Sequence, residues 1–209
     1  MSQINEFHAA VIRNLPDNLT ARDMQLWIAN PSRLRPLLRL AFSGRFNTTL
    51  FPTWITIPLG AGPRTSSEFI NALEEGGFGP LSDWTKNILI KSTLENRART
   101  VKLVKVSPFE LGFVGTPHLG EFYDRAQELG LRLCPPEVGP QLRLQYTNQP
   151  KGEGVYMGMT PIRLDKNTKH VFHVTNELHN PMLNGTCYEL HHSVHRDDKW
   201  VFIQCKSQS

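Results

Sequence analysis

The strongest local pattern in this chain is a helix with well-marked ends at residues 116–130. Thr116 is a favoured N-cap residue, and Pro117 suits the first helical position, where a backbone N–H is not needed. Gly130 stands where a helix often ends on a left-handed residue. Apolar side chains recur at helical spacing between these ends, at Leu119, Phe122, Ala126 and Leu129. A fold for this chain must therefore bury one face of this helix.

Two shorter runs follow the helix. Residues 141–146 alternate between polar and apolar side chains, as a half-buried strand does. Residues 148–154 contain Asn, Pro and two Gly and predict a turn, after which residues 155–159 predict a returning strand. The centre of the chain is thus expected to be a helix, a proline-rich connection and a hairpin.

Helices are expected early in the remaining sequence and strands late. Short helices are predicted within residues 3–41, and two more begin after Thr65, with Glu68 completing a capping box, and after Ser82. Strands are predicted at 53–57, 101–106, 131–133, 160–164, 169–175, 188–194 and 199–204, with a loop at 176–185.

This order predicts an α+β fold, with N-terminal short helices and then a mostly antiparallel sheet with one or more helices packed on a face. We expect a small helical layer at residues 1–46. An α+β domain with a C-terminal antiparallel meander is expected at residues 47–209, and the two parts could also form one continuous domain.

Composition narrows the class of protein. The apolar share of 39% is sufficient for a core, and the net charge of +4 permits contact with nucleic acid without arguing for it. Cys134, Cys187 and Cys205 include no close pair, which predicts reduced thiols in a cytoplasmic protein. No apolar run approaches the roughly 20 residues that cross a bilayer, and the first residues lack the pattern of a secretory signal. We therefore expect a soluble protein with no membrane partner.

The chain resembles a family of uncharacterised conserved bacterial proteins, common in candidate-phyla bacteria. The resemblance is carried by ELGLRLCPPEVGPQLRLQYTNQPKGE at residues 128–153, with MQLWIANPSRLRPLLR, WITIPLG, VKLVKVSPFELGF and the closing DDKWVF. It covers nearly the whole chain and implies a bacterial origin and a shared fold. It implies no activity, cofactor or partner, and it carries over no functional residue.

Histidines are concentrated in the predicted meander. The six there are His170, His173, His179, His191, His192 and His195. If strands 169–175 and 186–194 are neighbours, His173 and His191 share a face, and His195 can join them from a loop with Asp197 or Asp198. Neutral imidazoles bind zinc and similar divalent metals, so this set is a candidate metal site. The spacing matches no standard motif, and the alternatives are surface histidines or a pH-sensitive surface.

Arginines are frequent in the predicted N-terminal helices. Arg33, Arg35 and Arg39 either form a solvated face or contact phosphates of a nucleic acid, which would make binding dependent on salt.

Three further residues are candidates for a binding site. Glu137 and Arg143 either form a buried ion pair or line a pocket with Gln145 and Tyr146. Trp200 is either a core residue or an exposed recognition residue.

Two other features invite a chemical interpretation. Cys187 lies near several histidines, so it is either a thiol nucleophile or a half-buried strand cysteine. Residues 59–63 contain Gly-Ala-Gly but lack the Gly-Lys-Ser/Thr ending of a phosphate loop, so a nucleotide site is not predicted there.

No catalytic motif stands out, and the sequence favours a non-enzymatic cytoplasmic binding or interaction module whose partner is a protein or a nucleic acid. The first alternative is a metal-dependent hydrolase or nuclease that uses the C-terminal histidines. The second is a nucleic-acid-binding protein that uses the N-terminal arginines. The sequence predicts neither the oligomeric state nor a reaction.

Overall fold

The computed structural model describes residues 20, 24–25, 29, 51–113, 115–177 and 180–204. The chain divides into two compact units, Met1–Thr48 and Thr49–Ser209, and the architecture below is that of the second unit. The helices expected within residues 3–41 lie outside the described residues, except for a few isolated positions. They therefore stay a prediction.

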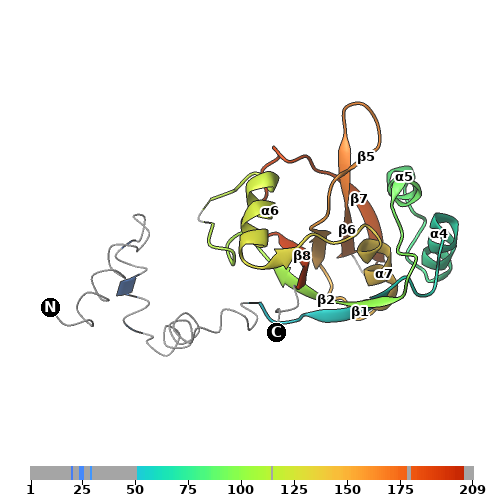
Figure 1. The fold of residues 1–209 in the computed structure, drawn as a ribbon, viewed down its shortest axis with the longest axis horizontal. Helices are drawn as coiled ribbons and strands as arrows, with labels where there is room; N and C mark the ends of the chain where they lie inside the picture. The colour runs from blue at the N-terminus through green and yellow to red at the C-terminus, as the bar shows by residue number, and fades with distance from the viewer. Residues whose placement is uncertain are drawn as a thin grey trace. The chain divides into compact units, whose positions relative to one another are not determined.

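The second unit is an α+β fold built on one eight-stranded sheet, as the sequence predicts (Figure 1). The strands run in the order β1-β2-β8-β4-β6-β5, with β3 also paired to β8 and β7 also paired to β6. Pairing in the described sheet is antiparallel except between β4 and β8, which are parallel. The strands are β1 (Ile55–Leu59), β2 (Arg99–Val106), β3 (Leu131–Arg132), β4 (Gly154–Met157), β5 (Ile162–Arg163), β6 (Lys169–Glu177), β7 (Asn180–Cys187) and β8 (Lys199–Gln204).

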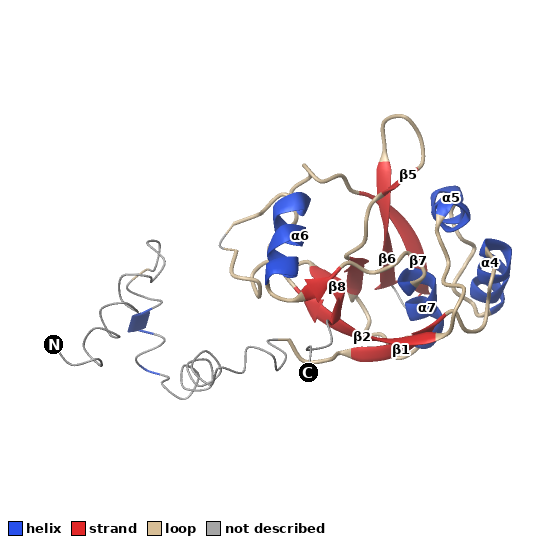
Figure 2. Ribbon diagram, viewed as in Figure 1, coloured by secondary structure: helices blue, strands red, loops and turns tan. Residues whose placement is uncertain are grey.

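Helices cover both faces of this sheet, and Figure 2 shows α6 on the opposite side from α4 and α5. The described helices are α4 (Ser66–Glu75), α5 (Asp83–Lys91), α6 (Leu119–Glu128) and α7 (Val138–Gln145). On one face, the Phe122 ring of α6 lies 5.6 Å from the ring of Trp200 and 5.5 Å from that of Phe202. On the other face, α7 approaches so closely at Gly139 that a Cβ atom there would lie 2.7 Å from the ring of Phe172.

The helix starts predicted from capping residues are confirmed for α4 and α5. The Thr65 hydroxyl accepts from the Glu68 N–H at 3.1 Å, and the Ser82 hydroxyl accepts from the Thr85 N–H at 3.2 Å. The central helix is also confirmed as α6, but its N-cap is His118 rather than Thr116. The Glu121 carboxylate accepts from the His118 N–H at 2.9 Å, which gives this later start its support.

The strand predicted at 141–146, and with it the hairpin, is wrong. Residues 141–145 belong to α7, with Tyr146 as its C-cap, and β4 pairs instead with β6 and β8. Alternation over six residues does not separate period 2 from period 3.6, since Val138 and Leu142 lie one helical turn apart and both are buried. Packing of that face on the sheet decides for the helix.

The loop predicted at 176–185 is also wrong, because most of it is β7, and the possible strand at 188–194 is irregular. Pro181 was the misleading signal. The Tyr188 N–H donates to the Lys169 carbonyl at 2.9 Å, which fixes the alternation of the β6–β7 ladder. In that alternation Pro181, opposite Asn176, is at a position that needs no N–H toward β6.

No helix in the described part of the chain is long and apolar enough to span a bilayer.

Candidate anion-binding cavity

The three histidines proposed as metal ligands are not brought together. His173 lies in β6 opposite Asn184, whereas His191 and His195 are exposed in the segment after β7. Within residues 51–113, 115–177 and 180–204, no group of three His, Cys, Asp or Glu side chains could hold a metal ion. His179 lies outside the described residues. The shared face fails because β7 is formed by 180–187 and not by 186–194.

His173 instead belongs to a ladder of stacked rings with Trp200. The Tyr156 ring stacks on His173 with centroids 3.8 Å apart, and on Trp200 with centroids 4.9 Å apart. Burial lowers the pKa of His173 to about 4, so its imidazole is neutral at pH 7. Trp200 is fully buried, which makes it a core residue rather than an exposed recognition residue.

Arg143 is fully buried and ties α7 to its surroundings. Its guanidinium donates to the Gln149 side-chain oxygen at 2.5 Å, to the Thr175 carbonyl at 3.2 Å and to the Tyr146 carbonyl. It also lies over the Phe78 ring, 4.8 Å from the centroid. Burial lowers the pKa of Arg143 to about 10.

Glu137 is buried as well, but it does not form the predicted ion pair with Arg143. Its carboxylate accepts from the backbone N–H of Gly60 at 2.6 Å and from that of Glu95 at 2.6 Å. In the glycine loop at 59–63, the backbone N–H of Gly60 is therefore already occupied by the Glu137 carboxylate. Glu137 holds three segments together and does not line a pocket beside a hairpin.

The N-terminal candidates Arg33, Arg35 and Arg39 lie outside the described residues, and their role in binding stays a prediction.

A cavity of about 350 Å³ lies at the end of the sheet where β3 meets β8. Its polar lining is Arg99, Arg132 and Thr160. The remaining lining residues are Leu133, Cys134, Pro135, Pro136 and Ile203. The cavity thus has two guanidinium groups and an apolar wall, and none of its lining residues is acidic.

Strand register places both arginines on the same face of the sheet. Arg132 of β3 is opposite Ile203 of β8, which is also opposite Leu103 of β2. Side chains alternate along a strand, so Arg99, four positions before Leu103, emerges on that same face. The two positive charges therefore converge because β2 and β3 both pair with β8.

The two guanidinium groups differ in how they are held. Arg99 donates to the Glu95 carboxylate at 2.6 Å, and the Glu95 backbone is in turn held by Glu137. Arg132 is exposed and makes no side-chain hydrogen bond or ion pair to any residue that the structure describes. Glu95 thus holds the Arg99 guanidinium in place and offsets part of its charge, whereas the Arg132 guanidinium is free to meet a ligand.

Cys134, in the wall of the cavity, is held by two hydrogen bonds and carries an unreactive thiol. The Cys134 N–H donates to the Gly158 carbonyl at 2.7 Å, and its thiol donates to the Val201 carbonyl at 3.3 Å. Burial raises the pKa of the Cys134 thiol far above its usual range, which keeps it protonated. The lining offers no general base and no activated nucleophile, so the arrangement is suited to binding an anion rather than to transforming it.

No local pattern in the sequence predicts this cavity. Arg99 lies within residues 95–100, a polar run that predicts a loop, and Arg132 alternates with Leu131 and Leu133 as the polar residues of an ordinary strand do. Their convergence depends on the pairing of β2 and β3 with β8, which no local pattern encodes. Comparisons with protein-family models, with curated proteins and with solved structures found no match to this chain.

Proposed function

We propose that this protein is a non-enzymatic binding module whose ligand is a small organic anion, held between Arg99 and Arg132. The observation that supports this most directly is the cavity of about 350 Å³ with two guanidinium groups and no acidic side chain in its lining. Pockets that take small ligands begin at about this size and combine an apolar wall with a few polar groups.

The class of ligand follows from the chemistry of the lining. Guanidinium groups bind carboxylates and phosphates through paired N–H donors, and each such charge-assisted hydrogen bond contributes about 1.5–3 kcal/mol. Pro135, Pro136 and Ile203 give the same cavity an apolar side. An anion with an apolar body fits both parts, whereas a bare inorganic ion uses only one of them.

A cytoplasmic location in a bacterium is part of the same proposal. It is supported by Cys134 and Cys187, which are both free thiols in the structure. Bacterial origin is supported by the family resemblance of residues 128–153. The metal-dependent hydrolase and the arginine-mediated nucleic-acid binder stay alternatives, but no group of described residues favours either of them.

Isothermal titration calorimetry on the untagged full chain tests this proposal. The titrants are aliphatic and aromatic carboxylates and phosphate monoesters, with inorganic phosphate for comparison. We expect at least one organic anion to bind more tightly than inorganic phosphate. Arg132→Gln should weaken that binding tenfold or more, which corresponds to about 1.4 kcal/mol.

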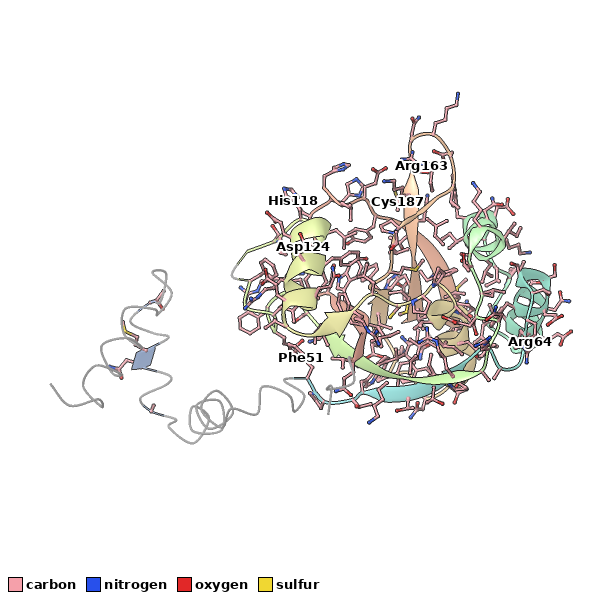
Figure 3. All side chains as sticks on the ribbon, in the orientation of Figure 1. Phe51, Arg64, His118, Asp124, Arg163 and Cys187 are labelled. Carbon is pink, nitrogen blue, oxygen red and sulfur yellow. The ribbon has the colours of Figure 1, made fainter. Side chains whose placement is uncertain are left out.

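Arg64→Gln is the matched control. Arg64 is an exposed arginine beside α4, labelled in Figure 3, and it does not line the cavity. This variant should bind like the original protein. The proposal is overturned if no anion of the panel binds, or if Arg64→Gln weakens binding as much as Arg132→Gln.

A further inference from the structure

Cys187 and His170 are direct cross-strand neighbours on β7 and β6. The adjacent pair, Tyr188 and Lys169, is hydrogen-bonded, so the His170–Cys187 pair is of the non-hydrogen-bonded type, in which side chains lie closer together. Both side chains therefore project on the same face of the sheet. Cys187, labelled in Figure 3, is exposed at the end of β7, whereas His170 is 5% exposed.

A chain of hydrogen bonds defines which nitrogen of His170 carries the proton. The Thr168 hydroxyl donates to the Asp165 carboxylate at 2.7 Å, and this uses its single proton. The 3.3 Å contact between the Thr168 oxygen and His170 Nε2 must then be a donation from Nε2–H to that oxygen. Neutral His170 is therefore the Nε2–H tautomer, and its Nδ1 is a bare lone pair.

The Nδ1 lone pair of His170 accepts no hydrogen bond from any residue that the structure describes. The Nδ1 atom itself is buried. Leaving a buried polar atom unpaired is unfavourable, so such atoms are uncommon. The Cβ atoms of a pair like His170 and Cys187 are separated by about 5 Å. At this separation the Cys187 thiol and the His170 imidazole are near neighbours on one face of the sheet.

The surroundings keep His170 neutral and ordered. The Trp84 ring of α5 stacks on the imidazole with centroids 5.2 Å apart and an interplanar angle of 15°. Burial lowers the pKa of His170, and the nearby charge of Asp165 opposes this only in part. The Thr168 hydroxyl lowers the pKa of Asp165, which therefore stays ionised.

Other charged groups lie on the elements around His170. Lys91 at the end of α5 donates to the carbonyls of Arg163 and Leu164, and Asp83 stands at the start of α5. The Arg163 guanidinium donates to the Lys166 carbonyl. Within the described chain, none of these groups makes a hydrogen bond or ion pair with His170.

We propose that His170 acts as general base for Cys187, and that this pair is a site where a hydroperoxide oxidises the thiol to a sulfenic acid. The Cys187 proton moves to His170 Nδ1, and the sulfur attacks the terminal oxygen of the peroxide. The S–O bond forms as the O–O bond breaks, and the leaving alkoxide takes the proton from Nδ1 to give an alcohol. Sulfur loses two electrons and the peroxide gains them.

The test is the rate at which Cys187 becomes sulfenylated in the full-length reduced protein. The probe is tert-butyl hydroperoxide, with dimedone as the trap and peptide mass spectrometry as the readout. His170→Asn should slow the reaction at pH 6.5 by tenfold or more. Thr168→Val, which removes the acceptor that selects the tautomer, should slow it less. His192→Asn is the control and should react like the original protein, and buried Cys134 should stay unlabelled.

The pH profile of the unmodified protein gives a readout that a structural role of His170 would not move. The rate should fall less steeply from pH 8 to pH 6.5 than that of a small reference thiol, which slows about tenfold per pH unit in this range. Burial lowers the pKa of His170, so the neutral imidazole that acts as base persists as the pH falls. A Cys187 profile parallel to that of the reference thiol overturns the proposal, even if His170→Asn fails to fold. Equal rates for folded His170→Asn and the original protein also overturn it.

Discussion

The Glu137 carboxylate accepts a hydrogen bond from the backbone N–H of Gly60 at a distance of 2.6 Å. Its second oxygen accepts from the N–H of Glu95, also at 2.6 Å. One buried side chain therefore joins the start of α7 to the loop after β1 and to the segment before β2. The segment before β2 leads directly to Arg99 at the edge of the cavity. Both the stability of the fold and the geometry of the candidate site therefore depend on the Glu137 carboxylate.

Removal of the Glu137 carboxylate should destabilise the protein. Glu137→Ala leaves two backbone N–H groups without their partner, and each buried unsatisfied donor costs about 1–3 kcal/mol. Urea unfolding should show a loss of about 2–6 kcal/mol in the free energy of unfolding. Exposed Glu75 provides the control, since Glu75→Ala should change this value by less than about 0.5 kcal/mol. Similar losses for both variants would contradict the role given to Glu137.

Replacement of Arg143 should be among the most destabilising single changes in α7. Arg143→Met leaves the Gln149 side-chain oxygen and two backbone carbonyls without their donor. Breaking a buried polar cluster of this kind costs about 3–5 kcal/mol. Arg143→Lys should recover only part of the loss, because an ammonium lacks the planar fork of a guanidinium. Full recovery by lysine, measured by urea unfolding, would show that charge alone matters there.

The stability of the fold should fall between pH 6.5 and pH 4 because of His173. Burial lowers its pKa to about 4, compared with the ordinary 6.5 of the unfolded chain. Between these values the unfolded state binds a proton that the folded state excludes, so stability rises with pH in this window. The contribution is complete above pH 6.5 and amounts to about 3 kcal/mol at most, at about 1.4 kcal/mol per pKa unit.

His173→Phe preserves a ring against Tyr156 and removes the titration. Unfolding in urea at pH 7 and pH 4.5 should therefore show a smaller pH dependence for this variant than for the original protein. If the free energy of unfolding changes equally with pH in His173→Phe and in the original protein, His173 is not the group that titrates.

A methyl group at Gly139 should not be tolerated in α7. Its Cβ would lie 2.7 Å from the Phe172 ring, closer than such atoms approach in folded proteins. Gly139→Ala should lower the free energy of unfolding by about 1–3 kcal/mol, as overpacking does. Gly115→Ala is the matched control, because no atom lies within 4 Å of the added methyl group. Equal stability of the two variants would show that α7 is packed less tightly than the structure indicates.

Local signals in the sequence were sufficient for much of the architecture. The capping residues Thr65 and Ser82 predicted the starts of α4 and α5, and Gly130 marked the end of α6, whereas the start of α6 was predicted too early, at Thr116 and Pro117. Such signals depend on contacts within a few residues. The α+β class followed from the order of these elements along the chain.

The errors came from segments whose state depends on distant partners. Residues 141–146 alternate like a strand, but burial of Leu142 and Arg143 against the sheet makes them helical. Pro181 resembles a loop residue until its position opposite Asn176 is known. The cavity was missed for the same reason, since Arg99 and Arg132 are far apart in sequence and meet only through β8.

An NMR titration of isotope-labelled protein with the tightest organic anion from the calorimetric panel locates the binding site directly. We expect the largest shifts for the Arg132 and Arg99 side-chain N–H groups and for the backbone at 132–134 and Thr160. Saturation should coincide with the calorimetric affinity. Shifts that leave Arg132 and Arg99 unchanged, and that cluster instead around Tyr156 and His173, would place the ligand elsewhere and contradict the assignment of the cavity as the binding site.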